Sequence, residues 1–208
     1  MSTPPAFADA AETWNRRYAG AEFLFGTEPN AWLREHTSAL PSGGRILSVA
    51  DGEGRNSVWL ARQGFQVDAF DVADRAVEKA KAFAEREGVS VNFSVADVDG
   101  FAWPEAAYDG VAAIFVQFAD PVTRARLFER IVRSLKPGGV LILQGYTPKQ
   151  LEYRTGGPPI LSHLYTRELL ESAFADLSII ELREYEAEVR EGQGHSGQSA
   201  LVGLVARR

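Results

Sequence analysis

From about Arg45 to Leu143 the chain alternates short apolar segments with longer amphipathic ones, and this alternation constrains its fold more than any other feature. The short segments are rich in β-branched residues and apolar on both faces, which is typical of strands buried within a parallel sheet. The longer segments repeat apolar residues at helical spacing. Their order predicts a doubly wound α/β sheet, covered by helices on both faces and connected by right-handed crossovers.

Glycines and capping residues give the boundaries of these elements. Gly64 and Gly88 are expected to end two helices, because glycine readily adopts the positive φ that follows a helix. Asp74 is expected to cap one helix, and Asp120 followed by Pro121 to begin another. The predicted strands are 44–49, 65–71, 91–95, 110–116 and 140–143, with a first helix at 56–63 and a turn at 136–139.

The carboxyl-terminal part departs from this rhythm. After a helix near 166–174, two more strands are predicted at 177–189 and 199–206, joined by a glycine-rich turn at 190–198. Strands joined by a short loop must be antiparallel. The predicted fold is therefore a doubly wound, mostly parallel seven-stranded sheet with a C-terminal antiparallel hairpin. The length of 208 residues suits one domain, with a helical segment over 1–40 and a core over 44–208.

Charge patterning argues against a nucleic-acid partner. The formal net charge is −6 and no dense Lys/Arg cluster appears, whereas nucleic-acid binders usually carry a basic stripe. Four arginines of one predicted helix are interleaved with Glu129, and we interpret them as a solvated helix face. These are Arg124, Arg126, Arg130 and Arg133.

Composition also argues against a secreted, membrane or metal-binding protein. No apolar run approaches about 20 residues, and the first residues do not resemble a signal peptide. Cysteine is absent, which excludes disulfides and thiolate ligands and is compatible with a reducing compartment. The three histidines, His36, His163 and His195, lack metal-ligand spacing. We expect a cytoplasmic protein, a monomer or homodimer, with no membrane partner and no metal.

A strand that runs into a glycine loop and then a helix is the strongest sign of a ligand site. Residues 46–49 lead into a loop that contains Gly52 and Gly54, and the helix begins just beyond. Glycine is needed where backbone approaches a ligand closely. Asp71 ends the next strand, where its carboxylate can accept hydrogen bonds from both hydroxyls of a ribose. NAD-binding and S-adenosylmethionine-binding proteins share this arrangement, so Asp71 does not distinguish them.

Asp97 ends the third strand and is a candidate for binding the base of the same cofactor. Its carboxylate can accept from an adenine amino group, while the N–H of Val98 can reach a ring nitrogen. Asp99 is a competitor for this role. An Asx turn is the alternative explanation for Asp97, because aspartate side chains commonly accept from nearby backbone N–H groups in loops.

These segments together resemble the class I S-adenosylmethionine-dependent methyltransferases, and among them the small-molecule enzymes similar to tellurite-resistance and thiopurine S-methyltransferases. The resemblance runs from about Trp14 to the C-terminus. Its most specific parts are 50–56 (Ala-Asp-Gly-Glu-Gly-Arg-Asn), the strand ends at Asp71 and Asp97, Tyr108-Asp109, and 135–139 (Leu-Lys-Pro-Gly-Gly). The resemblance implies S-adenosyl-L-methionine as cofactor, with core contacts from Ala50, Gly52, Gly54, Asp71, Val72, Asp97 and Val98.

Two positions depart from the family's usual pattern. Ser48 stands where the family usually has an acidic residue, and Ala50 replaces the first glycine of the loop. Ala50 permits a tight turn if its φ stays negative. Another group must then help to hold the ammonium of the cofactor, and Asp51 and the carbonyl of Ala50 are the candidates.

An aromatic cluster precedes the first strand. In the small-molecule methyltransferases that this chain resembles, the N-terminal segment lies over the cofactor, which implies a lid formed by Trp14, Tyr18, Phe25 and Gly26. A sulfonium cation suits an aromatic face. A plain packing helix is the alternative interpretation of the same residues.

Three remote parts of the chain are expected to meet on the acceptor side, since ligands of open α/β sheets bind beyond the carboxyl ends of the parallel strands. Gln117 follows the fourth strand, Tyr146 the fifth, and His195 lies in the predicted glycine-rich turn. His195 is the candidate base or substrate ligand, because its pKa lies near neutrality; an exposed turn histidine is the alternative. Arg154 is a weaker candidate for holding an anionic substrate.

The predicted reaction is methyl transfer to a small molecule, with a thiol or a chalcogen oxyanion such as tellurite as candidate acceptors. Such nucleophiles need no strong base, whereas a hydroxyl or an amine does. One alternative is an NAD(P)-dependent oxidoreductase, which the glycine spacing and the C-terminal hairpin disfavour. Another is a non-catalytic module that binds S-adenosylmethionine. The sequence does not give the acceptor.

Overall fold

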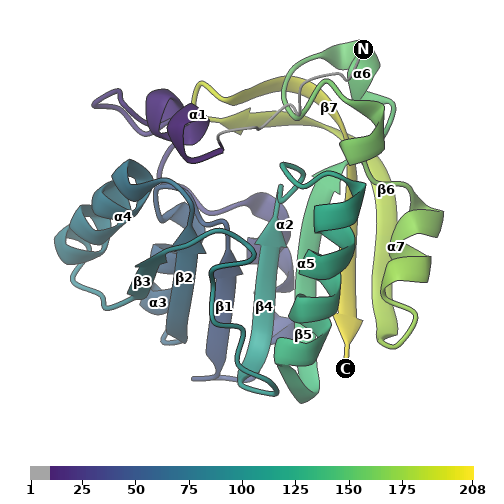
Figure 1. Cartoon of the computed structure of the whole chain (residues 1–208), viewed down its shortest axis with the longest axis horizontal. Coiled ribbons are helices and arrows are strands. Elements are labelled where there is room, and N and C mark those ends of the chain that lie inside the picture. Colours follow the sequence, from purple (N-terminus) through teal and green to yellow (C-terminus); the bar gives the residue numbers. More distant parts are fainter. Residues whose placement is uncertain (1–9) are drawn as a thin grey trace.

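The computed structural model describes residues 10–208, which form one seven-stranded sheet with helices on both faces (Figure 1). The strand order is β3-β2-β1-β4-β5-β7-β6, in which β7 is antiparallel to both neighbours and the other pairings are parallel. The predicted fold class is confirmed. The strands are β1 (Arg45–Val49), β2 (Gln66–Asp71), β3 (Asn92–Val95), β4 (Tyr108–Ile114), β5 (Leu135–Tyr146), β6 (Ser178–Glu191) and β7 (His195–Arg207).

The helices divide between the two faces according to the alternation of residues along the central strands. Val111 and Ala113 of β4 pack in the same cluster as helices α5 and α7, whereas Ala112 and Ile114 pack with α2 and α3 on the other face. Since both sets are buried, β4 is apolar throughout, as its sequence predicted. The helices are α1 (Ala10–Arg17), α2 (Ala31–His36), α3 (Arg55–Arg62), α4 (Asp74–Arg86), α5 (Pro121–Ser134), α6 (Gln150–Tyr153) and α7 (Arg167–Ala173), with 3-10 turns at Thr37–Ala39 and Leu161–His163.

One of the two predicted helix caps is present in the structure, and the other is not. Asp120 caps α5, and its carboxylate accepts from the N–H of Thr123 at 2.7 Å. Asp74 does not cap α4: Ala73 occupies the cap position, and Asp74 is the first helical residue. The helix begins one residue early because Asp71 already accepts from the N–H of Ala73, at 2.9 Å.

Two predicted turns are shorter in the structure than in the sequence pattern. The segment 136–139 is not a separate turn but part of β5, which pairs with β4 from Leu135 onward across an irregularity in register. The predicted glycine-rich turn over 190–198 contracts to 192–194, because β6 and β7 remain paired as far as Glu191 and His195. His195 therefore lies on a strand, 8% exposed, and is not an exposed turn histidine.

The β6–β7 hairpin extends past the rest of the sheet and bends over the carboxyl ends of the parallel strands toward α1 (Figure 1). Its tip is joined to the segment after α1, since the N–H groups of Gln193 and Gly194 both donate to the carbonyl of Leu24, at 2.9 and 3.0 Å. The segment after α1 and the tip of the hairpin therefore form a common roof over the carboxyl ends of the parallel strands (Figure 1).

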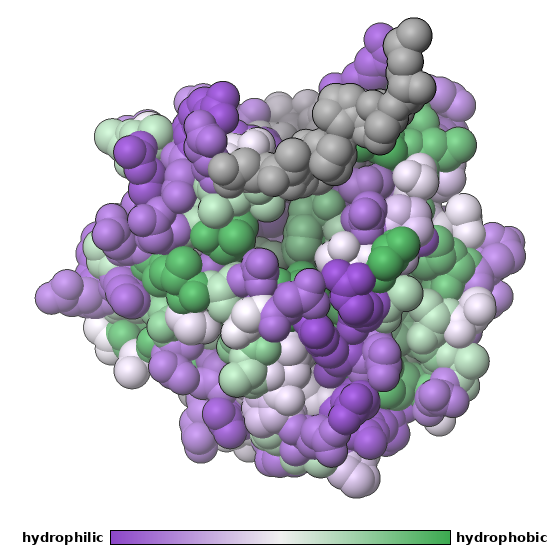
Figure 2. All heavy atoms as spheres, in the orientation of Figure 1, coloured by the Kyte–Doolittle hydropathy of each residue, from purple (hydrophilic) through white to green (hydrophobic). Residues whose placement is uncertain are grey.

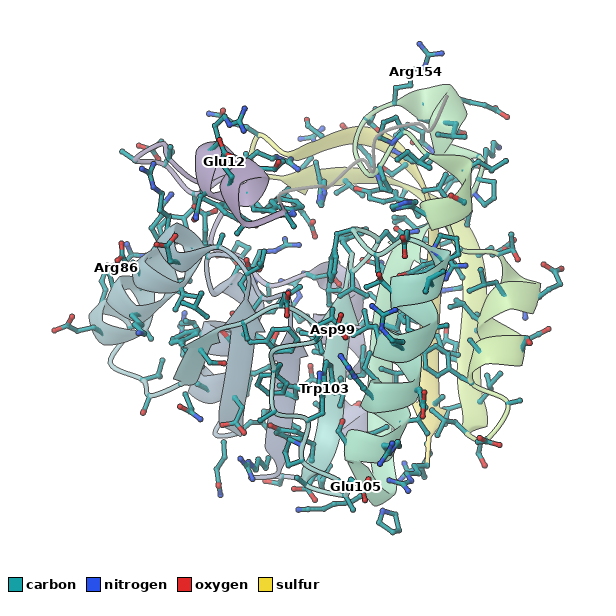
Figure 3. The ribbon with its side chains drawn as sticks, in the orientation of Figure 1. Glu12, Arg86, Asp99, Trp103, Glu105 and Arg154 are labelled. Atoms are coloured by element: carbon teal, nitrogen blue, oxygen red, sulfur yellow. The ribbon has the colours of Figure 1, made fainter. Side chains whose placement is uncertain are left out.

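The arginines of α5 lie on its outer side, where Figure 2 shows strongly hydrophilic side chains. Arg126 and Arg130 both pair with Asp99, and Arg133 pairs with Glu105; Figure 3 shows both carboxylates beside α5. These arginines thus form ion pairs with nearby carboxylates of the protein, as expected of a solvated helix face.

Within residues 10–208, no helix combines the length and the apolar character that crossing a membrane requires.

We predict that Gly203→Ala destabilises the fold by about 1–3 kcal/mol, because a Cβ there would lie 2.3 Å from the ring of Trp32. Trp32 is 1% exposed and packed against His36 and Tyr185, so it has no room to move. Urea unfolding measures the change. Gly20→Ala is the control, since no atom lies within 4 Å of a Cβ at that position. Equal unfolding midpoints for the two variants would contradict the packing argument.

Candidate active site

A cavity lies at the carboxyl ends of the parallel strands, beneath α1. It is bordered by the turns after β1, β2, β3 and β4 and by the hairpin residue His195. Nine of the ten residues predicted to bind a cofactor line it: Trp14, Tyr18, Phe25, Ala50, Gly52, Asp71, Val72, Asp97 and Val98.

Gly54 is the predicted cofactor residue that does not line this cavity. A Cβ at Gly54 would lie 2.9 Å from the Cβ of Ala80 on α4, and the glycine has a φ of 91° at the start of α3. The structure therefore explains Gly54 by close packing of two helices and a left-handed helix start. Gly52 is the position of close approach, since a Cβ there would lie 2.9 Å from the hydroxyl of Tyr18.

The backbone is strained where two neighbouring strands end at the cavity. Ala50 has a φ of 48° and Phe115 a φ of 55°, so both adopt the left-handed conformation. The expectation of a negative φ at Ala50 is therefore wrong: the turn keeps the backbone of the missing glycine, at a cost of about 1–2 kcal/mol for a residue with a Cβ. Strain of this kind concentrates at functional sites.

Two backbone hydrogen bonds hold the carboxylate of Asp71 beside the glycine loop. Its Oδ2 accepts from the N–H of Gly52 at 2.9 Å, and its Oδ1 accepts from the N–H of Ala73 at 2.9 Å. Burial raises the pKa of Asp71 to about 6, although both hydrogen bonds act in the opposite direction. The carboxylate keeps lone pairs for a ligand, because two oxygens offer about four acceptor sites.

Asp51 and Ser48 form a closed unit beneath the loop. Oδ1 of Asp51 accepts from the hydroxyl of Ser48 at 2.6 Å and from the N–H of Ser57 at 3.2 Å, and the hydroxyl of Ser57 donates to Oδ2. Burial raises the pKa of Asp51. Ser48, which stands where the family usually has an acidic residue, thus donates a hydrogen bond to the carboxylate of Asp51. Asp51 also lines the cavity.

Asp97 forms the Asx-type turn that was the alternative to adenine binding. Its Oδ1 accepts from the N–H groups of Asp99 and Gly100, at 3.0 and 2.6 Å. Asp97 and Val98 still line the cavity, whereas Asp99 is an ion-pair partner of α5 and does not. The turn and a contact from the other oxygen of Asp97 are compatible.

Aromatic rings of the segment 14–25, here called the lid, form one wall of the cavity. Trp14 stacks on Tyr18 with ring centroids 5.6 Å apart, and Tyr18 packs edge-on against Phe25 at 6.4 Å. Glu53 attaches this lid to the glycine loop: its carboxylate accepts from the N–H of Leu24 at 2.7 Å and pairs with Lys79. Glu53 is 4% exposed, so this connection is internal.

A second cavity of about 300 Å³ adjoins the first. His195 borders both, together with the rings of Trp14, Phe25, Phe115 and Phe118. The predicted acceptor-side residues Gln117 and Tyr146 line only the second cavity, which also has Arg17 and the turn 156–159 on its wall. Arg154 is not among its lining residues and points outward from the end of α6 (Figure 3).

His195 is held by a buried ionic cluster. Its Nδ1 lies 3.1 Å from Oε2 of Glu191, the residue opposite it across the hairpin, and the same oxygen accepts from Nη2 of Arg55 at 2.8 Å. The other oxygen of Glu191 accepts from the amide of Asn30 at 3.0 Å. Burial lowers the pKa of His195, a change that Glu191 only partly offsets. Burial alone would raise the pKa of Glu191, but His195 and Arg55 lower it to about 2.

Gln117 and Tyr146 differ in whether their side-chain polar atoms already have hydrogen-bond partners within the described residues. The amide of Gln117 donates to the carbonyls of Tyr146 and His163 and accepts from the N–H of Tyr146, so its polar atoms join the ends of β4 and β5. The hydroxyl of Tyr146 is buried and has no hydrogen-bond partner among the described residues. Burial raises the pKa of Tyr146, which keeps it a neutral donor.

The sequence prediction missed several residues of the site. Arg55 and Asn56 belong to the 50–56 motif but were given no site role, and Phe115 was assigned to the interior of a strand. Nothing in the sequence pointed to Glu191. It contacts His195 because the two residues pair across the hairpin, whereas the sequence pattern had placed both of them in a turn. Among the described residues no group of His, Asp and Glu side chains is arranged to hold a metal ion.

The part of the chain that builds the glycine loop and the ends of β1 to β4 also carries the family signature. Residues 46–139 match the family model described as a methyltransferase domain. This matched segment, slightly less than half of the chain, is a methyltransferase domain of the class I, S-adenosylmethionine-dependent type. The family's cofactor is S-adenosylmethionine.

Two curated relatives match about half of the chain. One is a ubiquinone biosynthesis O-methyltransferase of Xanthomonas axonopodis pv. citri, 35% identical over 52% of this chain and 46% of the relative. The other is an S-adenosyl-L-methionine-dependent Diels-Alderase of Talaromyces variabilis, 31% identical over 49% of this chain and 36% of the relative. The chain thus spans less than half the length of these two relatives.

A solved structure shows the same fold over nearly the whole chain. TehB from Haemophilus influenzae superposes with a TM-score of 0.69 at 14% identity, covering 95% of this chain and 66% of that one. At this identity the likeness establishes the fold alone.

The residues that line the first cavity fit S-adenosylmethionine. Asp71 offers free carboxylate lone pairs where a ribose would bind, and Gly52 leaves backbone uncovered beside it. The rings of Trp14 and Phe115 suit the sulfonium cation. Nη1 of Arg55 is a buried donor without an acceptor among the described residues, which suits an anionic group of the cofactor.

We predict that Asp71→Ala weakens S-adenosylhomocysteine binding at least tenfold, or about 1.4 kcal/mol, because the ribose loses its carboxylate. Affinity of the unaltered protein should also fall as pH drops below about 6, where Asp71 takes up a proton. Calorimetry from pH 5 to 8 measures both effects. Asp74→Ala is the control, since Asp74 is exposed and accepts from the N–H of Arg75. Unchanged affinity in Asp71→Ala would remove Asp71 from the ribose role.

Proposed function

We propose that this protein transfers a methyl group from S-adenosylmethionine to a small molecule held in the second cavity, with His195 as general base. The observation that carries the proposal is the position of His195, which borders both the cofactor cavity and the adjoining one. An acceptor in the second cavity would meet the cofactor at this residue. The cofactor, when bound, supplies a methyl group already activated by a positive sulfur.

The protonation of His195 suits a base. Its lowered pKa keeps the ring neutral at pH 7. Because Glu191 is ionised and can only accept, Nδ1 of His195 carries the hydrogen, and Nε2 keeps the lone pair that can take a proton. The remaining task of the protein is to align the acceptor and exclude water, which the roof of α1 and the hairpin supports.

The second cavity favours a small, largely apolar acceptor with a removable proton. Its wall combines the rings of Phe115 and Tyr146 with Pro158 and Pro159, and Arg17 supplies a cation at one side. A thiol or a hydroxyl gains more from a neutral base than does an oxyanion such as tellurite, which is already nucleophilic. We therefore rank a thiol or hydroxyl acceptor above tellurite, and the O-methyltransferase relative agrees with a protic acceptor.

A second candidate function is a reaction other than methyl transfer in which the cofactor stays intact. The relative named as a Diels-Alderase favours this possibility, since its printed name couples that reaction to S-adenosyl-L-methionine. A non-catalytic module that binds the cofactor is a related alternative. The oxidoreductase alternative loses its support, because both the matching family model and the antiparallel hairpin belong to methyltransferases.

A panel of acceptors tests the proposal directly. Thiols, phenols, amines, selenite and tellurite are each incubated with the protein and S-adenosylmethionine, and formation of S-adenosylhomocysteine is followed. Production of S-adenosylhomocysteine that depends on one acceptor class supports methyl transfer and identifies the nucleophile. Tight cofactor binding without turnover on any acceptor would favour the second candidate.

We predict that His195→Ala lowers turnover at least tenfold while S-adenosylhomocysteine affinity changes less than twofold, because the base contributes to the reaction more than to binding. Steady-state kinetics and calorimetry measure the two quantities. His36→Gln is the control, since His36 lies on α2, bonded to Trp32 and Glu181 and outside both cavities. Full activity in His195→Ala would show that His195 is not the base.

A further inference from the structure

The two terminal nitrogens of the Arg55 guanidinium differ, because one has a hydrogen-bond partner and the other has none among residues 10–208. Arg55 is the first residue of α3 and 7% exposed, and its Nη2 donates to Oε2 of Glu191 at 2.8 Å. Its Nη1 is fully buried and has no hydrogen-bond partner among residues 10–208. Buried polar groups in proteins are almost always hydrogen-bonded, and a charged donor most of all. The unpartnered nitrogen therefore points to an acceptor that a ligand provides.

The acids of the cofactor cavity are already engaged elsewhere. Glu53 pairs with Lys79 and accepts from the N–H of Leu24. Asp51 is bonded to two serines, and Asp71 to two backbone N–H groups. Arg55 itself lines this cavity. Its missing acceptor is thus an anion that enters the cavity, and the anionic group of S-adenosylmethionine is the carboxylate of its methionine part.

We propose that Arg55 binds this carboxylate through Nη1 while Nη2 keeps its bond to Glu191, so that one guanidinium connects the cofactor to the His195–Glu191 pair. The planar fork of arginine suits this task, because it presents separate N–H groups to two carboxylates at once. Arg55 is then a cofactor ligand and also a positioning residue for the base. The link to the base rests on the proposed function, whereas the carboxylate contact does not.

The connection has a consequence for His195. The charged or titratable groups around it are Glu191 on β6, Arg55 on α3, Arg17 on α1 and Tyr146 on β5. In the unliganded protein the charge of Arg55 helps to lower the pKa of His195. A carboxylate bound to Arg55 offsets part of that charge. The bound carboxylate therefore acts to raise the pKa of His195, whereas the ammonium and the sulfonium of S-adenosylmethionine act to lower it.

A matched pair of ligands tests the carboxylate contact without any turnover. S-adenosylhomocysteine and its decarboxylated analogue, which keeps the amine, are titrated by calorimetry into the unaltered protein and into Arg55→Gln. We expect Arg55→Gln to weaken S-adenosylhomocysteine at least tenfold and the analogue less than twofold. Binding of the analogue shows that the variant is folded. Equal losses for both ligands, or no loss for either, would overturn the proposal.

Two further variants sharpen the comparison. Arg55→Lys keeps one charge but lacks the fork, so it should bind S-adenosylhomocysteine with intermediate affinity. Arg62→Gln is the control on the same helix, because Arg62 is an exposed residue paired with Glu87. It should leave both affinities unchanged, and a loss there equal to that in Arg55→Gln would point to a general effect on α3 and overturn the proposal.

The link to the base has its own test. The pKa of His195 is measured by NMR titration of the imidazole in the free protein and with each ligand bound. We expect the pKa of His195 to be higher with S-adenosylhomocysteine bound than with the decarboxylated analogue, because only the first ligand brings a carboxylate to Arg55. Equal shifts with both ligands would break the link to His195 yet leave the carboxylate contact standing on the calorimetry. Cofactor binding without methylation of any acceptor would end the proposed function while leaving the Arg55 contact intact.

Discussion

The buried ion pair of Arg55 and Glu191 joins parts of the chain that no local rule brings together. Arg55 starts the helix after the glycine loop, and Glu191 ends the long strand of the terminal hairpin. Taking two charges out of water is costly, so such a pair persists where further hydrogen bonds satisfy it. His195 and Asn30 supply these bonds to Glu191. The position of the hairpin over the sheet, and with it the orientation of His195, depends on this cluster.

Backbone hydrogen bonds of Leu24 connect the parts of the roof over the strand ends. Leu24 provides its carbonyl to the hairpin tip and its N–H to Glu53 of the glycine loop. Leu24 thus connects the lid both to the hairpin and to the glycine loop. Neither attachment is a large hydrophobic interface, and elements held by few contacts open at lower free energy than the core.

The sequence was sufficient for the fold and for most of the residues that line the first cavity. Alternating apolar segments predicted the sheet, and the turn rich in glycine led to Gly52 and Asp71, because strand ends in a parallel sheet meet at one edge. It failed where a contact depends on pairing between distant segments. Glu191 meets His195 only because the hairpin stays paired further than its glycines suggested. Ala50 was expected to avoid the left-handed region, yet the surrounding turn imposes it.

The residues of the candidate site lie on both sides of the boundary of the family match. Residues 46–139 carry Asp71, Asp97 and the glycine loop, whereas Tyr146, Glu191 and His195 lie beyond them. The turns that line the first cavity therefore lie largely inside the match, whereas the second cavity combines Phe115 and Gln117 from inside it with Tyr146 and His195 from outside. Arg55 lies inside the matched part and bonds to Glu191 outside it. If it also holds the cofactor, this one side chain is where a common cofactor site is connected to chemistry specific to the chain.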